Sequence, residues 1–474
     1  MNEQTFEEKL PFKFKMGYAG AYTTNSILDG IGMAAISFFY TDFLKLDPIL
    51  ASWVWFIFLF WNMFNDPLFG IIEDKTKNEK LGRRVPYLRY SAPLYVLAFL
   101  LCWYPLIDVS SQIGLFFDML IALFVLDTFF TIVGLITYAL PAEMTLTQKA
   151  RSSLILFGTL FGVIGVVISY ILPVFLLTSS AAATELDTVI RPAMIFIGIT
   201  CGILLYASSY FIKENDYTRN EEPLGFKASI VETFKNKPFL IFEGSKIFQV
   251  IVNTTLTTSI TYYVKYVLQL TSGGIVGAIP ILAVFVVAIV FIFIYNKFMP
   301  RLGAKKILIF GYIWGGMGFL LLFFIGGDFI TALIGFSIIG VGYSAAMIAS
   351  GVLFSDTVDF DEVRTGKRRE TTYAGMEAFL TKPSISIANS LFLVIISIFG
   401  YSSNMSSVDL ESVKLGVLFA ACIPSAIFFF IAAVILYFYP LDTPDWNAKK
   451  LELHEIHEQK EREYLASLQE KETT

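Results

Sequence analysis

A short polar run interrupts a long apolar stretch where the sequence reads WNMFNDPLFGIIEDK. Asn62 and Asp66 stand four residues apart, which places both on one face of a helix, and Asn65 lies beside them. Such an oxygen-rich face suits a cation. Lys382, within AGMEAFLTKPSISIANS, is the obvious opposite charge, because an unpaired ammonium inside a membrane is costly. We therefore expect a cation, either sodium or a proton, to compete with Lys382 for Asp66.

Two interpretations of Asp66 and Lys382 stay open. The pair either takes part in cation coupling, or it is a fixed ion pair between helices that only holds two parts of the protein together. Pro67 and Pro383 directly follow the two charged residues. Because a proline frees the carbonyl four positions earlier for an ion or a bend, these prolines favour the functional interpretation.

Other ionisable residues within apolar runs are candidates for substrate binding. They are Asp29, Asp127, Lys246 and Glu377. Asp127, Thr131 and Gly134 share one helical stripe, which either faces the substrate or packs against a neighbouring helix through small and hydroxyl side chains. Glu377 is placed by the helical repeat on a different side from Lys382, so it is the weaker candidate.

Charged residues also gather just after two of the apolar runs, in predicted inner loops. Solvated loop charge is the simple interpretation. Alternatively, acids at helix ends can face arginines of the other half, latch the inner side shut, and separate when it opens. The candidates for this cytoplasmic gate are Asp74, Arg83, Arg84, Asp356, Asp359, Arg364 and Arg369.

The composition shows which elements must position these residues. Hydrophobic residues make up 55% of the 474 positions and charged residues 16%, against about a quarter charged in an ordinary soluble chain. A helix needs about 20 apolar residues to cross the hydrocarbon core of a bilayer. Apolar runs of this length recur, so the sequence predicts an all-α membrane protein with twelve transmembrane helices in a lipid bilayer. The predicted spans are 17–42, 49–72, 88–107, 113–140, 153–177, 191–212, 239–268, 274–297, 305–326, 329–354, 371–400 and 413–439.

The longest internal polar stretch, KENDYTRNEEPLGFKASIVETFKNKP, lies between the sixth and seventh predicted spans and divides the chain into two halves. A short internal repeat supports two halves, because NEKLGRRVPY and FMPRLGAKKI both place Leu-Gly before a basic pair. The predicted segments are a cytoplasmic amino-terminal segment (1–16), a six-helix bundle (17–212), a cytoplasmic linker (213–238), a second six-helix bundle (239–440) and a charged cytoplasmic tail (441–474).

Basic residues predict the orientation, because lysine and arginine accumulate in cytoplasmic loops. With the amino terminus inside, 29 of the 35 lysines and arginines fall in inner segments, and Lys246 and Lys382 fall within spans. Only Lys45, Arg191, Lys265 and Lys414 lie at outer ends. Both termini are therefore expected in the cytoplasm, which requires an even number of spans, and the protein is expected to be a multi-pass protein of the cell or plasma membrane.

Cysteine and histidine positions argue against a membrane enzyme. Cys102, Cys201 and Cys422 lie in apolar runs without paired spacing, so neither a disulfide nor a thiolate metal site is expected. Both histidines, His454 and His457, lie in the tail, and no phosphate-cradling glycine loop is present. We expect no cofactor and no nucleic-acid partner, and a monomer that binds a small-molecule substrate.

Three motifs resemble the melibiose permease family of glycoside-pentoside-hexuronide:cation symporters, within the major facilitator superfamily. They are the Asn-Asp-Pro that runs into GIIEDKTKNEKLGRRVPY, then FTIVGLITYALPAEMT, and SDTVDFDEVRTGKRRETTYAGMEAFLTK. The resemblance covers both halves and implies the major facilitator fold of two six-helix bundles. It also implies that Asp66, Asn65 and Asn62 occupy the coupling-cation positions, with sodium at Asp66. Thr131 then matches the family's helix-four threonine and Lys382 its helix-eleven lysine.

Departures from the family pattern bear on coupling and substrate. Asn62 is neutral where melibiose permease has a second carboxylate, which weakens the attraction for sodium. Gly134 stands where the family has Asp or Asn, and the galactoside-binding acid of helix one has no direct match. Asp29 and Asp127 lie about one turn away from these places and could substitute for them. A galactoside substrate is therefore not supported.

Together these observations predict a secondary active transporter. It would carry a small solute, such as a sugar, glycoside or uronide, with sodium or a proton, while two bundles alternate access to a central site. Two alternatives stay open. One is a carrier of lysophospholipid or another amphipathic solute, because such a branch shares these motifs and the chain has 47 phenylalanines. The other is a non-transporting membrane receptor.

Overall fold

A computed structural model describes most of the chain. The described residues are 10–76, 84–107, 109–145, 147–178, 185–212, 233–270, 275–366, 369–402, 409–443 and short stretches up to residue 459. Within these residues the regular structure is entirely helical, with no β-strand. The described part of the chain is therefore all-α, as the sequence predicts.

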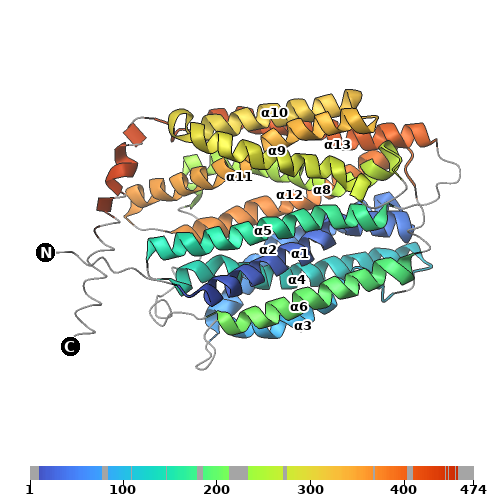
Figure 1. Cartoon of the computed structure of the whole chain (residues 1–474), viewed down its shortest axis with the longest axis horizontal. Helices are drawn as coiled ribbons and strands as arrows, with labels where there is room; N and C mark the ends of the chain where they lie inside the picture. Colours follow the sequence, from blue (N-terminus) through green and yellow to red (C-terminus); the bar gives the residue numbers. More distant parts are fainter. Residues whose placement is uncertain are drawn as a thin grey trace.

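Long helices follow one another along both halves of the chain (Figure 1). The first group comprises α1 (Phe12–Phe38), α2 (Pro48–Lys75), α3 (Val85–Leu101), α4 (Gln112–Met144), α5 (Gln148–Leu177) and α6 (Arg191–Phe211). The second group comprises α8 (Lys237–Tyr262), α9 (Ile275–Leu302), α10 (Ala304–Ile325), α11 (Phe329–Thr365), α12 (Glu370–Ile398) and α13 (Leu410–Tyr437). Single π-helical turns, η1 (Phe39–Phe43) and η4 (Tyr263–Val267), extend α1 and α8, and η2 (Leu186–Ile190) precedes α6.

Local sequence signals explain where several of these helices begin. Asp47 and Asn236 accept hydrogen bonds from the first backbone N–H groups of α2 and α8, and Asp328 does so for α11. The Thr331 hydroxyl and two backbone N–H groups hold the pKa of the Asp328 carboxyl below its usual range. At its other end α11 closes on Gly366 in the left-handed conformation, with φ 71°, which glycine adopts readily.

The ends of the predicted spans lie within about six residues of the ends of these helices, with one clear exception. The apolar run 329–354 corresponds to α11, which continues to Thr365. The added residues, SDTVDFDEVRT, are polar, so hydropathy could not assign them to the helix. They extend α11 beyond the apolar part of the bundle.

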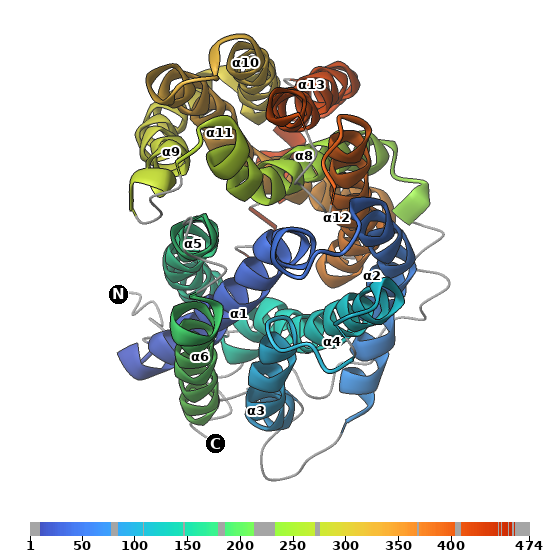
Figure 2. The same cartoon turned by 90° about the vertical axis from the view of Figure 1, so that its right-hand side faces the viewer.

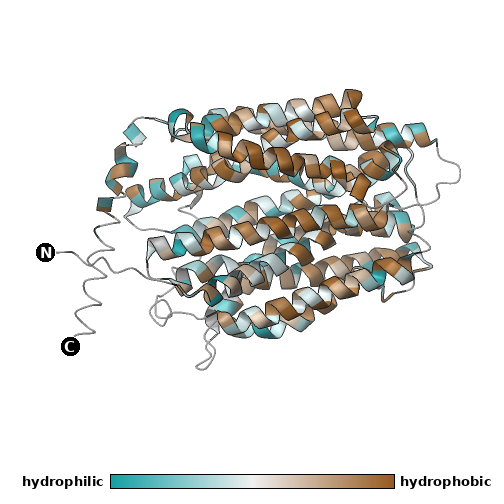
Figure 3. Cartoon of the chain, in the orientation of Figure 1, coloured by the Kyte–Doolittle hydropathy of each residue, from teal (hydrophilic) through white to brown (hydrophobic). Residues whose placement is uncertain are grey.

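Nine of the described helices are long and apolar enough to cross a membrane, and α3 is a shorter apolar helix. Helices α1 and α8, of 27 and 26 residues, are long enough but carry more polar residues. Hydrophobic residues predominate along α9 in Figure 3, as expected for a helix that crosses a bilayer. The number of twelve spans and the side of the membrane on which the termini lie stay predictions.

Seen along the helices, the two groups lie side by side (Figure 2). Except for α2 and α12, which pack extensively against each other, helices α1 to α6 pack mainly with one another, as do α8 to α13. Contacts between the groups involve α2 with α12, α5 with α9, and α1 with α8. The first turn of α1 and the last turn of α13 lie at the same end of the molecule (Figure 1). The boundary between α2 and α12 is thus where residues of the two groups meet.

Small residues allow the closest approach within the second group. The carbonyl oxygen of Gly311 in α10 would lie 2.6 Å from a Cβ atom placed on Gly342 of α11. A side chain at Gly342 would therefore push the two helices apart. Close contact through glycine is a common way for helices to associate in lipid, where packing replaces the hydrophobic effect.

Candidate functional site

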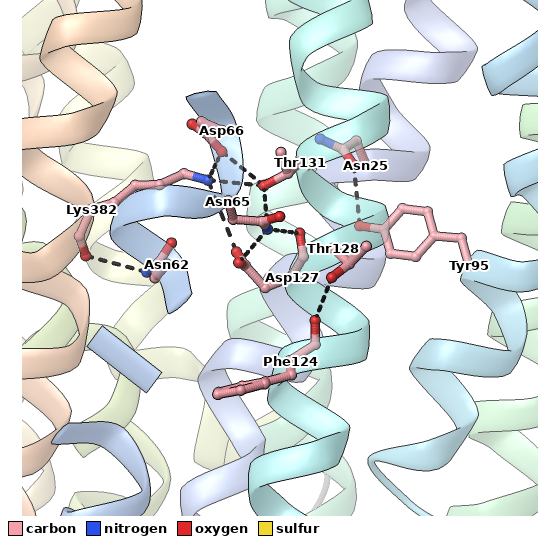
Figure 4. Close-up of polar contacts among 10 residues, drawn as sticks. All are labelled: Asn25, Asn62, Asn65, Asp66, Tyr95, Phe124, Asp127, Thr128, Thr131 and Lys382. Carbon is pink, nitrogen blue, oxygen red and sulfur yellow. Dashed lines mark hydrogen bonds and ion pairs between the residues drawn. The ribbon is translucent and has the colours of Figure 1, made fainter. Parts of the chain in front are cut away.

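Polar side chains from α2, α4 and α12 meet at the boundary between the two helix groups (Figure 4). Lys382 of α12 forms an ion pair with Asp66 of α2. Its Nζ also donates a hydrogen bond to the Thr131 hydroxyl of α4 at 3.1 Å. Thr131 in turn donates to Oδ1 of Asp66 at 2.8 Å. A single ammonium group therefore joins both helix groups through three helices.

Asn65 extends this network to Asp127. Its Nδ2 lies 2.7 Å from Oδ2 of Asp127 and 3.0 Å from the Thr131 hydroxyl. The other carboxylate oxygen of Asp127 lies 4.0 Å from Nζ of Lys382. The spacing of Asp127 and Thr131 predicts a shared face, and the structure places both in the same network as Asp66. Asp127 thus lies within the candidate cation site.

Two amide oxygens of this network have no hydrogen-bond donor. Oδ1 of Asn62 and Oδ1 of Asn65 are both buried without a partner. The amide nitrogen of Asn62 donates to the backbone carbonyl of Lys382 at 3.3 Å, which fixes how the side chain is held. Buried acceptors are normally satisfied, and hard cations prefer oxygen ligands. The donor set therefore fits a small cation or an ordered water.

The balance of charges at the site also favours a bound cation or an added proton. Asp29 of α1 lies close enough to interact electrostatically with Asp127 and Lys382, and its Oδ1 has no hydrogen-bond partner. Asp29, Asp66 and Asp127 together face a single positive charge on Lys382. If all three carboxylates were ionised, this buried cluster would hold an excess of negative charge, which is costly away from water. A bound cation or added protons would offset that excess.

The described residues contain no group of three or more histidine, cysteine, aspartate or glutamate side chains arranged to hold a metal ion. A sodium ion at Asp66 would therefore depend on amide and hydroxyl oxygens as well as carboxylates. Asn62, Asn65 and Thr131 supply such oxygens.

Two further candidates for substrate binding form a separate pair. Lys246 of α8 makes an ion pair with Glu377 of α12. Helical geometry places Glu377 on a different side from Lys382, and the structure agrees, because the two residues have different partners. Lys246 and Glu377 are thus already satisfied by one another.

Three of the candidate gate residues, Arg84, Arg364 and Arg369, have ion-pair partners in their own helix group. Arg84 contacts Glu73 at 2.8 Å and Glu143 at 3.3 Å, all within the first group. Arg364 and Arg369 both pair with Asp361 at the end of α11. Asp356 pairs with Lys450 of the tail, and Asp359 is buried. Arg83 and the side chain of Asp74 lie outside the described residues, so the latch stays a prediction.

A different contact between the groups was missed by the sequence analysis. Asp42 in η1 forms an ion pair with Lys265 in η4 and accepts a hydrogen bond from Tyr266. Next to it, Thr41 lies 2.8 Å from the Tyr262 hydroxyl. These residues lie at the end of the bundle opposite the first turn of α1. The sequence shows an acid, Asp42, and a lysine, Lys265, each near the end of an apolar run, but nothing in the sequence indicates that the two are partners.

Comparison with known proteins adds four findings. Residues 16–443 match the family described as MFS/sugar transport protein. The glucuronide carrier protein homolog of Escherichia coli (strain K12) is 23% identical over 439 residues, covering 92% of this chain and 93% of that protein. The sodium-dependent lysophosphatidylcholine symporter 1 of Mus musculus is 29% identical over 137 residues, covering 28% of this chain and 25% of that protein. The crystal structure of a D-xylose-proton symporter matches with a TM-score of 0.63 at 13% identity, covering 90% of this chain and 96% of that one, so the two share a fold.

Proposed function

The chain belongs to the MFS/sugar transport protein family, and from this premise we propose that it couples the transport of a small solute to a cation. The family confirms the resemblance of the sequence motifs, and it makes the chain a multi-pass membrane transporter rather than an enzyme. The proposed cargo is a sugar, glycoside or uronide, and the proposed coupling ion is sodium or a proton. The proposed mechanism is alternating access by two six-helix bundles.

The ion pair between Lys382 and Asp66 is the observation that carries this proposal. A cation at Asp66 would take over the negative charge that Lys382 now neutralises, with Asn62, Asn65 and Thr131 supplying further oxygens. Because the pair joins α2 to α12, binding of the cation would loosen the contact between the two groups. The cation would thereby change the balance between conformations, which is what coupling requires.

Contacts at one end of the bundle support alternating access. Asp42, Lys265 and Tyr266 link η1 to η4 and close the two groups together at that end. A transporter of this kind must break such contacts when the site opens on that side. We also propose that the protein works as a monomer in the bilayer.

Two alternatives differ in their cargo. The likeness to the lysophosphatidylcholine symporter covers little of either chain, whereas the likeness to the glucuronide carrier homolog covers nearly all of both. The network around Asp66 is polar and buried, which suits a small polar solute and an ion better than an acyl chain. A non-transporting receptor would need the ligand site but no ion-dependent change of conformation.

Ligand binding and transport measurements on the purified protein distinguish these functions. A ligand that binds only the folded protein raises its melting temperature, so sugars, uronides and lysolipids are screened in sodium, in potassium and at several pH values. Each compound that stabilises the protein is then offered to proteoliposomes with an imposed sodium or proton gradient. Accumulation that follows one gradient supports the proposal. Stabilisation without uptake under either gradient supports a receptor, and uptake of lysolipids alone supports the amphipathic carrier.

A further inference from the structure

Helix α8 carries a buried carboxylate that the proposed cation site does not use. Glu243 is 1% exposed, and neither of its side-chain oxygens has a hydrogen-bond partner. Burying an ionised carboxylate without a donor is costly, because nothing replaces the water that it loses. Glu243 therefore needs a positive partner or a proton.

The nearest positive charge is already engaged. Lys246 follows Glu243 by three residues, on the same face of α8, and the two interact electrostatically. The ion pair of Lys246, however, is with Glu377 of α12. Two carboxylates from two helices thus share one ammonium group, and in the structure Glu377 holds it.

In the part of the chain that the structure describes, Lys246 is the one cation that interacts electrostatically with Glu243. On α10, Tyr312 interacts electrostatically with Glu243, but its hydroxyl donates to Oε1 of Gln249 at 2.7 Å. On α11, Ser350 donates to the same oxygen at 3.3 Å. Helix α13 has no charged residue between Lys414 and Tyr437. The described surroundings of Glu243 therefore offer one ammonium group, that of Lys246.

We propose that Glu243 is a proton-binding site of the second helix group. Its protonation depends on whether Lys246 pairs with Glu377 or with Glu243. While Lys246 pairs with Glu377, Glu243 takes one proton from water and is a neutral carboxylic acid. When Lys246 turns to Glu243, the acid returns that proton to water and becomes a carboxylate. The step adds or removes one proton at one carboxylate oxygen and needs no other reactant.

The position of Glu377 gives this exchange a mechanical consequence. Glu377 and Lys382 lie five residues apart on α12, so a shift of that helix changes the Lys246 pair and the Asp66 pair together. Protonation of Glu243 would then be sensitive to the conformation of the transporter. The site goes beyond the proposed cation site, because it requires neither Asp66 nor an identified cargo.

Infrared spectroscopy of the purified protein in lipid tests the site directly. A protonated carboxyl group has a carbonyl stretching band that is separate from the bands of carboxylates. At neutral pH we expect Glu243→Gln to lose one such band relative to the wild type. Glu411→Gln, at an exposed position in the first turn of α13, is the matched control and should leave the band unchanged. A Glu243→Gln spectrum identical to the wild type would overturn the proposal.

A second pair of variants tests the control by Lys246. Glu377→Gln frees the ammonium group, so Glu243 should ionise and the same band should disappear although Glu243 is intact. Adding Lys246→Met removes that ammonium, and the band should return. Retention of the band in Glu377→Gln would show that Lys246 does not control Glu243. Size-exclusion profiles and melting temperatures identify any variant that fails to fold. If Glu243→Gln fails to fold, the infrared spectrum of Glu377→Gln still tests the proposal.

Discussion

Lys382 of α12 and Asp66 of α2 form an ion pair across the boundary between the two helix groups. Thr131 of α4 holds both partners, accepting from Lys382 and donating to Asp66. Separation of α2 from α12 must therefore break this pair. The predictions below follow from this relationship and from the other contacts between and within the two groups.

Removal of the lysine should leave Asp66 as an uncompensated buried charge. We expect Lys382→Met to destabilise the protein by about 3–5 kcal/mol, the usual cost of breaking a buried pair from one side. The double variant Asp66→Asn/Lys382→Met should recover most of that stability, because neither charge remains. Thermal unfolding in detergent measures both effects, with the exposed Lys13→Met as control. An equal loss of stability in the single and double variants would show that the broken ion pair is not the cause of the destabilisation.

A carboxylate at position 62 should strengthen sodium binding. Asn62 has a buried oxygen without a donor, and a charged oxygen there would attract a cation more strongly. We expect Asn62→Asp to raise the apparent sodium affinity about tenfold, or about 1.4 kcal/mol. The rise of melting temperature with sodium, relative to potassium, reports it. Asn253→Asp in α8 is the control and should show no sodium effect. An unchanged sodium response in Asn62→Asp would argue against an ion at this position.

Helix positions could be predicted well from the sequence, because long apolar runs separated by polar loops have few other solutions in a bilayer. The run 274–297 corresponds to α9 and the run 305–326 to α10. The end of α11 could not be predicted from hydropathy, since SDTVDFDEVRT is helical but polar. Helices α1 and α8 are also less apolar than the other helices, because each buries polar side chains in the interior of the bundle.

Contacts at the opposite end of the bundle should control opening on that side. We expect Lys265→Gln to speed labelling of an engineered Thr41→Cys by a membrane-impermeant maleimide roughly fivefold, equal to about 1 kcal/mol of weakened closure. Thr41 is buried in this structure, and all three native cysteines are buried, so background labelling should be low.

Asp187→Asn serves as the control for this experiment, because it breaks the pair with Arg191 at an exposed position within the first group. Its labelling rate should equal that of the parent Thr41→Cys protein. If Lys265→Gln labels no faster than the control, the contact between Asp42 and Lys265 does not hold this end closed.

Close packing of α10 and α11 should tolerate no side chain at Gly342. A Cβ atom there meets the Gly311 carbonyl at 2.6 Å, so we expect Gly342→Ala to destabilise the protein by about 1–3 kcal/mol. Gly351 lies on the same helix with nothing within 4 Å of an added Cβ. Gly351→Ala should therefore leave stability unchanged or raise it slightly. Thermal unfolding compares the melting temperatures of the two variants. Equal melting temperatures would contradict the close contact of α10 and α11 at Gly342.

The candidate site was predicted in part. Helical spacing puts Asn62, Asn65 and Asp66 together, and the scarcity of buried charge makes Lys382 the expected partner. The role of Asp127 as the hydrogen-bond partner of Asn65 could not be predicted, because it depends on how α4 is rotated against α2. Nor could the sequence show that Glu377 would engage Lys246 and leave Glu243 alone, since that depends on the packing of α8 against α12.

Cation-driven accumulation by Asp66→Asn is the measurement that tests the central claim most directly. Proteoliposomes receive the solute identified by the stability screen, and two rates are recorded for wild type and variant: accumulation under an imposed sodium or proton gradient, and exchange of labelled for unlabelled solute without a gradient. Exchange serves as the control for folding and solute binding. We predict that Asp66→Asn retains exchange and loses gradient-driven accumulation. Undiminished accumulation in the variant would contradict the assignment of Asp66 as the coupling residue.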